Sequence, residues 1–133
     1  MNVVIDASVT LAVLTSEPER AAIVKITQEA NLIAPASVHW EVGNALSALI
    51  KRRRLTLAQA RDAIQGYLRI PIRFVEVDLT ECLELTASHN LYAYDAYLLT
   101  CARSQRTPLL SLDKALLRAA KADHIGTVEV PER

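Results

Sequence analysis

Glycine is scarce in this chain, with only three glycines among 133 residues. Phosphate-binding loops of the P-loop and GxGxxG kinds need several glycines at fixed spacing, because their backbone amides approach the phosphates closely. Neither pattern occurs in the sequence. A Gly-rich nucleotide-binding loop is therefore excluded, and phosphate chemistry in this chain has to use other groups.

Cysteine is nearly as scarce, and the two cysteines, Cys82 and Cys101, are far apart in the sequence. A structural zinc site usually needs closely spaced pairs such as CxxC, and none is present. Both cysteines lie in stretches with helical periodicity. We expect them to be reduced, buried and to act as small hydrophobic side chains.

The chain also lacks an excess of charge and a long apolar run. Lys plus Arg and Asp plus Glu both number 15, so no net charge draws the protein towards nucleic acid or membrane. No apolar run reaches the roughly 20 residues that span a bilayer, and the N-terminus does not resemble a signal peptide. We expect a cytoplasmic protein without a membrane partner, folded as a single domain over residues 1–133.

Short apolar runs alternate with helical patterns along the whole chain. This order is typical of βαβ units, which predict an α/β fold with a mostly parallel sheet of four to five strands and helices on both faces. The expected strands are residues 3–5, 32–34, 74–77, 108–112 and 127–130. The expected helices are residues 8–14, 18–30, 37–53, 56–69, 80–89, 94–105 and 113–122, with Pro18 in a first turn and Thr56 as an N-cap.

Two aspartates follow two of these expected strands directly. Asp6 ends the run VVI, and Asp113 follows LLSL. Ligands of open parallel sheets bind beyond the carboxyl ends of the strands, and both aspartates fall at that edge. Taken alone, each is better explained as a helix N-cap.

Two further acids lie in helical patterns. Asp95 precedes Leu98 and Leu99 by three and four residues, so the helical period puts it on the apolar face, where a lone carboxylate is costly. Glu41 borders an apolar stripe, and Asn44 follows on the same side. Asp95 alone could be a first-turn aspartate that favours the helix dipole, and Glu41 alone could be a solvated edge residue.

The four acids together favour a metal site over these separate explanations. A βαβ topology directs all of them to one edge of the sheet, where their charges repel unless cations or protons neutralise them. Oxygen ligands without His or Cys select hard ions, namely Mg²⁺ or Mn²⁺. We expect Asp6, Asp95 and Asp113 to be the ligands, of either one ion or two.

Segments along nearly the whole chain, in order, resemble the PIN-domain family. They are VVIDAS, WEVGNAL, LYAYDAYLLTCA, PLLSLDKALLRAA and IGTVEV. The short single-domain form most resembles the VapC toxins of prokaryotic toxin–antitoxin pairs. Ser111 stands where many members carry Thr, and no further acid follows Asp113 closely.

The resemblance implies a three-layer α/β/α sandwich and a metal-dependent endoribonuclease. It implies that Asp6, Glu41, Asp95 and Asp113 are the catalytic acids. Three further positions, Ser8, Asn44 and Ser111, would lie near the metal. The resemblance also implies a homodimer and a VapB-like antitoxin whose segment covers the acidic pocket.

The basic run KRRR ends the helical pattern that carries Glu41. Its members, Lys51, Arg52, Arg53 and Arg54, could contact RNA phosphates. Compensation of the helix dipole and a solvated face explain the same residues without RNA.

Three other functions were weighed against a nuclease. A signalling receiver domain needs an acidic pair after the first strand, where this chain offers Asp6 alone. A haloacid-dehalogenase-like phosphatase needs D-x-D-x-T, and here Ala7 and Ser8 follow Asp6. A PIN fold that only binds RNA or a protein partner remains the main alternative.

Overall fold

The computed structural model describes residues 1–131, which form five strands and seven helices. The strands are β1 (Asn2–Ile5), β2 (Asn31–Pro35), β3 (Ile72–Val75), β4 (Leu109–Leu110) and β5 (Thr127–Val128). The helices are α1 (Ala7–Leu14), α2 (Arg20–Thr27), α3 (Ser37–Lys51), α4 (Leu57–Arg69), α5 (Leu79–His89), α6 (Ala93–Gln105) and α7 (Lys114–Ala122).

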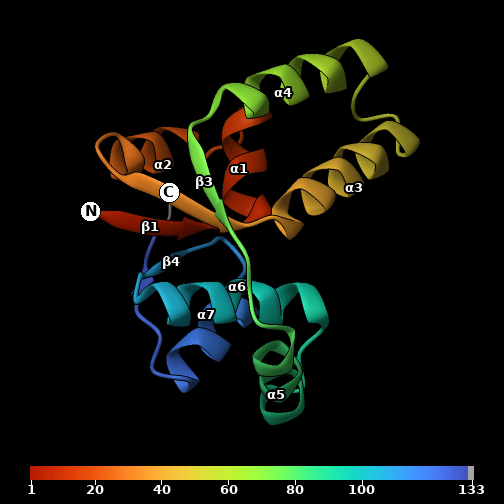
Figure 1. Ribbon diagram of the computed structural model, residues 1–133. Coiled ribbons are helices and arrows are strands. Elements are labelled where there is room, and N and C mark those ends of the chain that lie inside the picture. Colours follow the sequence, from red (N-terminus) through yellow and green to blue (C-terminus); the bar gives the residue numbers. More distant parts are fainter. Residues whose placement is uncertain (132–133) are drawn as a thin grey trace.

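The strands form one sheet in the order β3-β2-β1-β4-β5, and every neighbouring pair is parallel. Helices α1 to α4 cover one face of the sheet and α5 to α7 the other, which gives three layers (Figure 1). The predicted α/β fold is confirmed, and the sheet is parallel throughout its described strands rather than mostly parallel.

The strand order contains one topological switch point, between β1 and β4. From β1 the chain adds β2 and β3 on one side, then crosses the sheet and adds β4 and β5 on the other. Crossovers that leave two adjacent strands in opposite directions open a crevice beyond their carboxyl ends, and this crevice is the usual ligand site of such sheets. The predicted adjacency of the two aspartate-bearing strands is confirmed by the pairing of Val4 with Leu109 and of Ile5 with Leu110.

The central strands β1 and β4 are the most deeply buried part of the core. Val3, Val4, Leu109 and Leu110 are completely buried. Helices on both faces remove these side chains from water, so the strands are apolar throughout instead of alternating with polar residues. Apolar burial of this kind stabilises the fold by roughly 25 cal/mol per Å² and fixes the two strand ends at which the candidate site lies.

Side-chain caps set where several helices begin. Thr56 accepts a hydrogen bond from the Gln59 amide, and the Gln59 side chain bonds back to the Thr56 amide, so the predicted cap of α4 is a full capping box. Asp78 caps α5, which the sequence analysis did not predict. Asp6 and Asp113 cap α1 and α7 in the same way.

Several predicted boundaries were wrong, and those of β3 and α2 have a clear physical reason. Strand β3 spans residues 72–75 instead of 74–77, because its register with β2 pairs Ile72 with Leu32 and ends where β2 ends at Pro35. Helix α2 begins at Arg20 instead of residue 18, since Pro18 lies in a turn closed by a hydrogen bond from the Arg20 amide to the Glu17 carbonyl. Strands β4 and β5 are two residues long, shorter than predicted.

Both cysteines are free and buried, as predicted. Within residues 1–131, none of the helices has the length and apolar character that crossing a bilayer requires.

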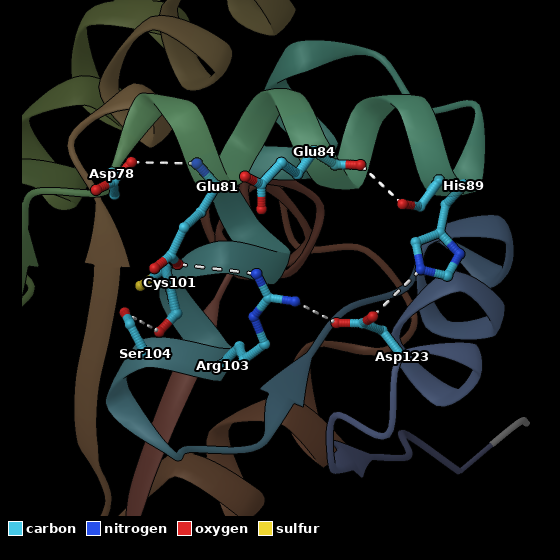
Figure 2. A network of polar contacts seen from close by, with 9 residues as sticks. Asp78, Glu81, Glu84, His89, Cys101, Arg103, Ser104 and Asp123 are labelled. Atoms are coloured by element: carbon cyan, nitrogen blue, oxygen red, sulfur yellow. Dashed lines mark hydrogen bonds and ion pairs between the residues drawn. The ribbon is translucent and has the colours of Figure 1, made fainter.

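A polar network joins α5, α6 and the end of α7 (Figure 2). The Asp123 carboxylate accepts from Arg103 at 3.1 Å and pairs with His89 Nε2 at 3.3 Å. Arg103 also reaches the Glu81 carboxylate at 3.8 Å. Because Arg103 and Asp123 each contact two partners, the network joins α5, α6 and the end of α7.

Replacement of Arg103 by methionine is expected to lower stability by about 1 kcal/mol, because it leaves the Asp123 carboxylate with one partner fewer while keeping the apolar stem. Thermal unfolding followed by circular dichroism measures the change. Lys121→Met is the matched control, since Lys121 pairs with Glu129 at an exposed site and such pairs contribute little. Equal melting temperatures for the two variants would show that the network adds no stability.

Candidate active site

Asp6 is held rigidly at the carboxyl end of β1. Its Oδ1 accepts hydrogen bonds from the Val9 amide at 3.1 Å and from Ser8 Oγ at 2.7 Å. Its Oδ2 accepts from Ser111 Oγ at 2.5 Å. The residue is only 4% exposed, and burial raises the pKa of Asp6, an effect that these hydrogen bonds oppose and the charge of Asp113 adds to.

The segment after β4 is joined to the same point. Ser8 Oγ accepts from the Leu112 amide at 3.0 Å, and Ser111 Oγ accepts from the Asp113 amide at 2.9 Å. Asp113 then turns its Oδ1 to the Ala115 and Leu116 amides and caps α7. The two serines therefore couple the ends of β1 and β4, which are about a hundred residues apart in the sequence.

Glu41 projects from α3 towards this edge and has an unusual environment. Its Oε1 is buried and has no hydrogen-bond partner among the described residues. Burial, together with the nearby charges of Asp6 and Asp95, raises the pKa of Glu41 to about 7. A buried carboxylate oxygen without a partner is costly, so its retention points to a ligand such as a cation or water.

Asp95 lies in the first turn of α6 and is half-buried, as its place on the apolar face predicted. Burial raises the pKa of Asp95, and the charges of Asp113 and Asp6 raise it further. The helix dipole at the N-terminus of α6 offsets only a small part of this cost.

The structure thus brings the four predicted acids within electrostatic reach of one another at the switch point. The N-cap explanation is confirmed for Asp6 and Asp113, and each of these carboxylates also lies close enough to the other acids to act on their pKa. Among residues 1–131, no three His, Cys, Asp or Glu side chains form a ready-made metal cage. An all-oxygen donor set with one unpartnered oxygen fits Mg²⁺, which keeps several waters and needs only one or two direct carboxylates.

A groove of about 680 Å³ opens beside these acids, between α1 and α3. It contains Ser8, Glu41 and Asn44, so the predicted second-rank Asn44 lies next to the acids and is exposed. Trp40 and Tyr94 line the same groove and were missed as site residues. Each directly precedes one of the four acids in the sequence, but only the exposure of the two rings distinguishes them from core aromatics.

The predicted RNA-binding residues of the basic run are not brought together at the acids. Lys51, Arg53 and Arg54 are exposed at the far end of α3, ten or more residues beyond Glu41. Arg52 differs, since it lines a second groove that also contains Ser8. A larger cavity of about 1000 Å³, which shares Glu19 and Leu112 with the second groove, is lined by Ser111 and by basic residues of α7, including Arg118.

His39, the histidine nearest to Glu41 in the sequence, has a structural partner. Its Nδ1 lies 2.9 Å from the hydroxyl oxygen of Tyr67, and its ring packs on Phe74 with centroids 4.2 Å apart. These contacts support the structural role that histidine usually has when it is not needed for chemistry.

Comparison with known proteins agrees with this geometry. Residues 3–122 match the PIN domain family. Ribonuclease VapC9 of Mycobacterium tuberculosis is 31% identical over 122 residues, which cover 90% of this chain and 92% of the relative.

Solved structures share the fold. PAE2754 from Pyrobaculum aerophilum superposes with a TM-score of 0.74 at 24% identity, over 98% of this chain and 92% of that one. VapBC2 from Rickettsia felis, solved bound to a DNA fragment from their promoter, reaches a TM-score of 0.67 at 8% identity, over 96% of this chain and 98% of that one. On the family match and the sequence relative together, the chain belongs to the PIN-domain family of nucleases, beside the VapC ribonucleases.

Proposed function

We propose that this chain is a Mg²⁺- or Mn²⁺-dependent endoribonuclease that hydrolyses phosphodiester bonds of RNA, with residues 1–133 forming a single domain. One observation carries the proposal. Four carboxylates from four separate segments meet at the switch point, where burial and neighbouring charges raise the pKa of three of them, Asp6, Glu41 and Asp95, and Glu41 has a buried oxygen without a partner among the described residues. Such an arrangement is unfavourable in the empty protein and favourable around a cation.

Asp6, Asp95 and Asp113 would hold the cation. When bound, a divalent cation neutralises charge on the reacting phosphate and makes a coordinated water more acidic. Ser8 and Ser111 keep the Asp6 carboxylate in one orientation through their hydrogen bonds to its two oxygens. Titration of the protein with Mg²⁺ would measure whether one ion or two ions bind.

We assign to Glu41 the task of orienting the attacking water. Its unpartnered Oε1 can accept a proton from a water placed between it and the phosphate, whereas the oxygens of Asp6 already accept protein donors. Asn44, exposed in the same groove, can contact the phosphate or the ribose.

Two cavities beside the acids each include an arginine that could contact the RNA backbone. Arg52 lines the groove that shares Ser8, and Arg118 lines the cavity that shares Ser111. Contacts of this kind position RNA without reading its sequence, and they weaken as salt rises.

We further propose that the protein is the toxin of a toxin–antitoxin pair, forms a homodimer and is inhibited by a VapB-like antitoxin. The support is the kinship with VapC ribonucleases and the fold shared with the VapBC2 proteins. An antitoxin side chain carrying positive charge would pair well with the four acids. Growth arrest on expression of the chain alone, relieved by co-expression of the neighbouring small reading frame, tests the toxin role.

Cleavage of a labelled RNA panel tests the nuclease. Mg²⁺ or Mn²⁺ is expected to support internal cleavage, EDTA to stop it, and Asp113→Asn to reduce it by about 10³-fold. Asparagine caps helices as well as aspartate does, so this variant removes charge without removing the cap of α7. Asp62→Asn, on the exposed face of α4, is the matched control and is expected to keep full activity.

Two results would contradict the proposal. RNA binding without cleavage under any metal condition would favour the alternative of a PIN fold that only binds RNA or a partner. Transfer of a phosphoryl group from acetyl phosphate to Asp6 or Asp113 would favour a receiver-type function instead.

A further inference from the structure

The groove beside the acids carries two large aromatic side chains that packing alone does not explain. Trp40 is 67% exposed and Tyr94 is 47% exposed, although both side chains usually bury most of their surface. Trp40 comes from α3 and Tyr94 from α6, and both line the groove that contains Ser8 and Glu41. Two elements from opposite faces of the sheet therefore each place an open ring next to the candidate site.

Each ring is supported by one other ring. Trp40 meets His39 at a centroid distance of 6.1 Å and an interplanar angle of 62°. Tyr94 meets Tyr97 at 5.9 Å and 87°. An edge-to-face contact uses at most one face of a ring, and the exposure of Trp40 and Tyr94 leaves ring surface available to a ligand.

Small apolar side chains, Ala7, Ala45 and Ala48, line the groove beside the two rings. Its volume of about 680 Å³ lies in the range of roughly 300–1,000 Å³ typical of ligand pockets. The neighbouring groove shares Ser8, Leu11, Ala45 and Ala48 with it and continues to Arg52. The two grooves therefore adjoin, and Arg52 lines the second one together with two further acids, Glu17 and Glu19.

We propose that Trp40 and Tyr94 stack on an unpaired base next to the scissile phosphate, and so select the nucleotide that enters the site. This inference rests on the proposed ribonuclease function and names the residues that position its substrate. Bases stack on aromatic side chains in single-stranded RNA recognition, whereas bases inside a duplex already stack on each other. Arg52 in the adjoining groove can contact the neighbouring backbone phosphate, and single-stranded RNA is the occupant that offers a base and a phosphate together.

Binding can be followed through Trp40 itself, because it is the only tryptophan in the chain. A short single-stranded RNA is titrated into the Asp113→Asn protein with Mg²⁺ present, so that cleavage does not interfere. Stacking is expected to quench the fluorescence with the single strand and to leave it nearly unchanged with a blunt duplex of the same sequence. Tyr94→Leu is expected to weaken this binding about tenfold, and Tyr94→Phe to preserve it.

Kinetics on the otherwise native protein give the second readout. Trp40→Ala is expected to raise KM about tenfold with little change in kcat, since base stacking positions the substrate and does not enter the chemistry. Trp40→Phe is expected to recover most of the loss. Leu83→Ala on α5 is the matched control, because Leu83 is 68% exposed and lines none of the grooves at the site.

The outcomes separate this inference from the proposed function. Quenching by single-stranded RNA in a protein that never cleaves RNA would support stacking and overturn the nuclease. Cleavage with an unchanged KM in Trp40→Ala, or equal quenching by duplex, would overturn stacking and leave the nuclease standing. If Trp40→Ala leaves RNA kinetics unchanged but converts a dimer to a monomer in light scattering, the groove is a protein interface and the inference is wrong.

Discussion

Asp95→Asn is expected to abolish RNA cleavage, with a loss of about 10³-fold or more in kcat/KM, and at the same time to raise the melting temperature of the metal-free protein. The two effects have one cause. In the empty protein the carboxylate of Asp95 is half-buried near the charges of Asp113 and Asp6, and this environment raises its pKa. A neutral amide of nearly the same shape removes that repulsion and removes the proposed metal ligand with it.

The sign of the stability effect follows from the direction in which folding shifts the pKa of Asp95. A carboxyl group whose pKa is raised by folding binds its proton more tightly in the folded state, so its ionised form disfavours folding at neutral pH. Asparagine cannot ionise, so the Asp95→Asn protein does not carry this unfavourable free energy. Because Asp95 is partly open to solvent, screening limits the gain to about 1 kcal/mol.

Thermal unfolding in EDTA and RNA cleavage in Mg²⁺ measure the two effects on the same preparation. Asp62→Asn on α4 is again the control, since it removes an exposed carboxylate far from the others. An Asp95→Asn protein with full activity would exclude Asp95 from the site. An inactive variant with a much lower melting temperature would show that Asp95 acts through the fold.

The acids were predictable from the sequence because each depends on a local regularity. Asp6 and Asp113 follow apolar strand runs, and a parallel sheet aligns the ends of adjacent strands. The helical period alone put Asp95 on an apolar face, where the structure finds it half-buried. These patterns can be read from the sequence because they arise from the backbone geometry of strands and helices.

Features that depend on tertiary register were not predictable in the same way. The hydrogen bonds from Ser111 to Asp6 and from the Leu112 amide to Ser8 join positions far apart in the sequence, so no local pattern signals them. The start of β3 at Ile72 is set by its pairing with β2, and the apolar run around it allows either position. Trp40 was missed for another reason, because a single aromatic residue in a helix is usually part of the core and only its exposure reveals otherwise.

The densest basic run in the sequence is not the part of the chain that lies nearest to the acids. The run KRRR is the densest cationic stretch in the chain, yet three of its four members lie away from the acids at the end of α3. Arg118 lies in a less conspicuous stretch, and the helical period of α7 brings it to the cavity that contains Ser111. Local charge density therefore does not by itself show which basic side chains lie beside the strand ends.

The metal-free protein is expected to lose stability as the pH rises from about 5 to 8, and Glu41 is expected to account for about 1–2 kcal/mol of this loss. Folding raises the pKa of Glu41 from its usual 4.5 to about 7. Below pH 4.5 both folded and unfolded chains carry the proton, and no difference exists. Between these two pKa values only the folded chain keeps the proton, so stability falls as the pH rises, and above pH 7 the full cost of the buried charge remains.

Urea unfolding at pH 5 and pH 8, in EDTA, compares the native chain with Glu41→Gln. The variant is expected to be more stable than the native chain at pH 8 and nearly equal to it at pH 5, whereas Glu84→Gln on the exposed side of α5 should match the native chain at both. Mg²⁺ at ten times its Kd should add about 1.4 kcal/mol to the native chain at pH 8, because it binds the folded state selectively. A pH dependence that Glu41→Gln leaves unchanged, or a native chain that Mg²⁺ fails to stabilise, would mean that the acids at the switch point are neither mutually repulsive nor a cation site.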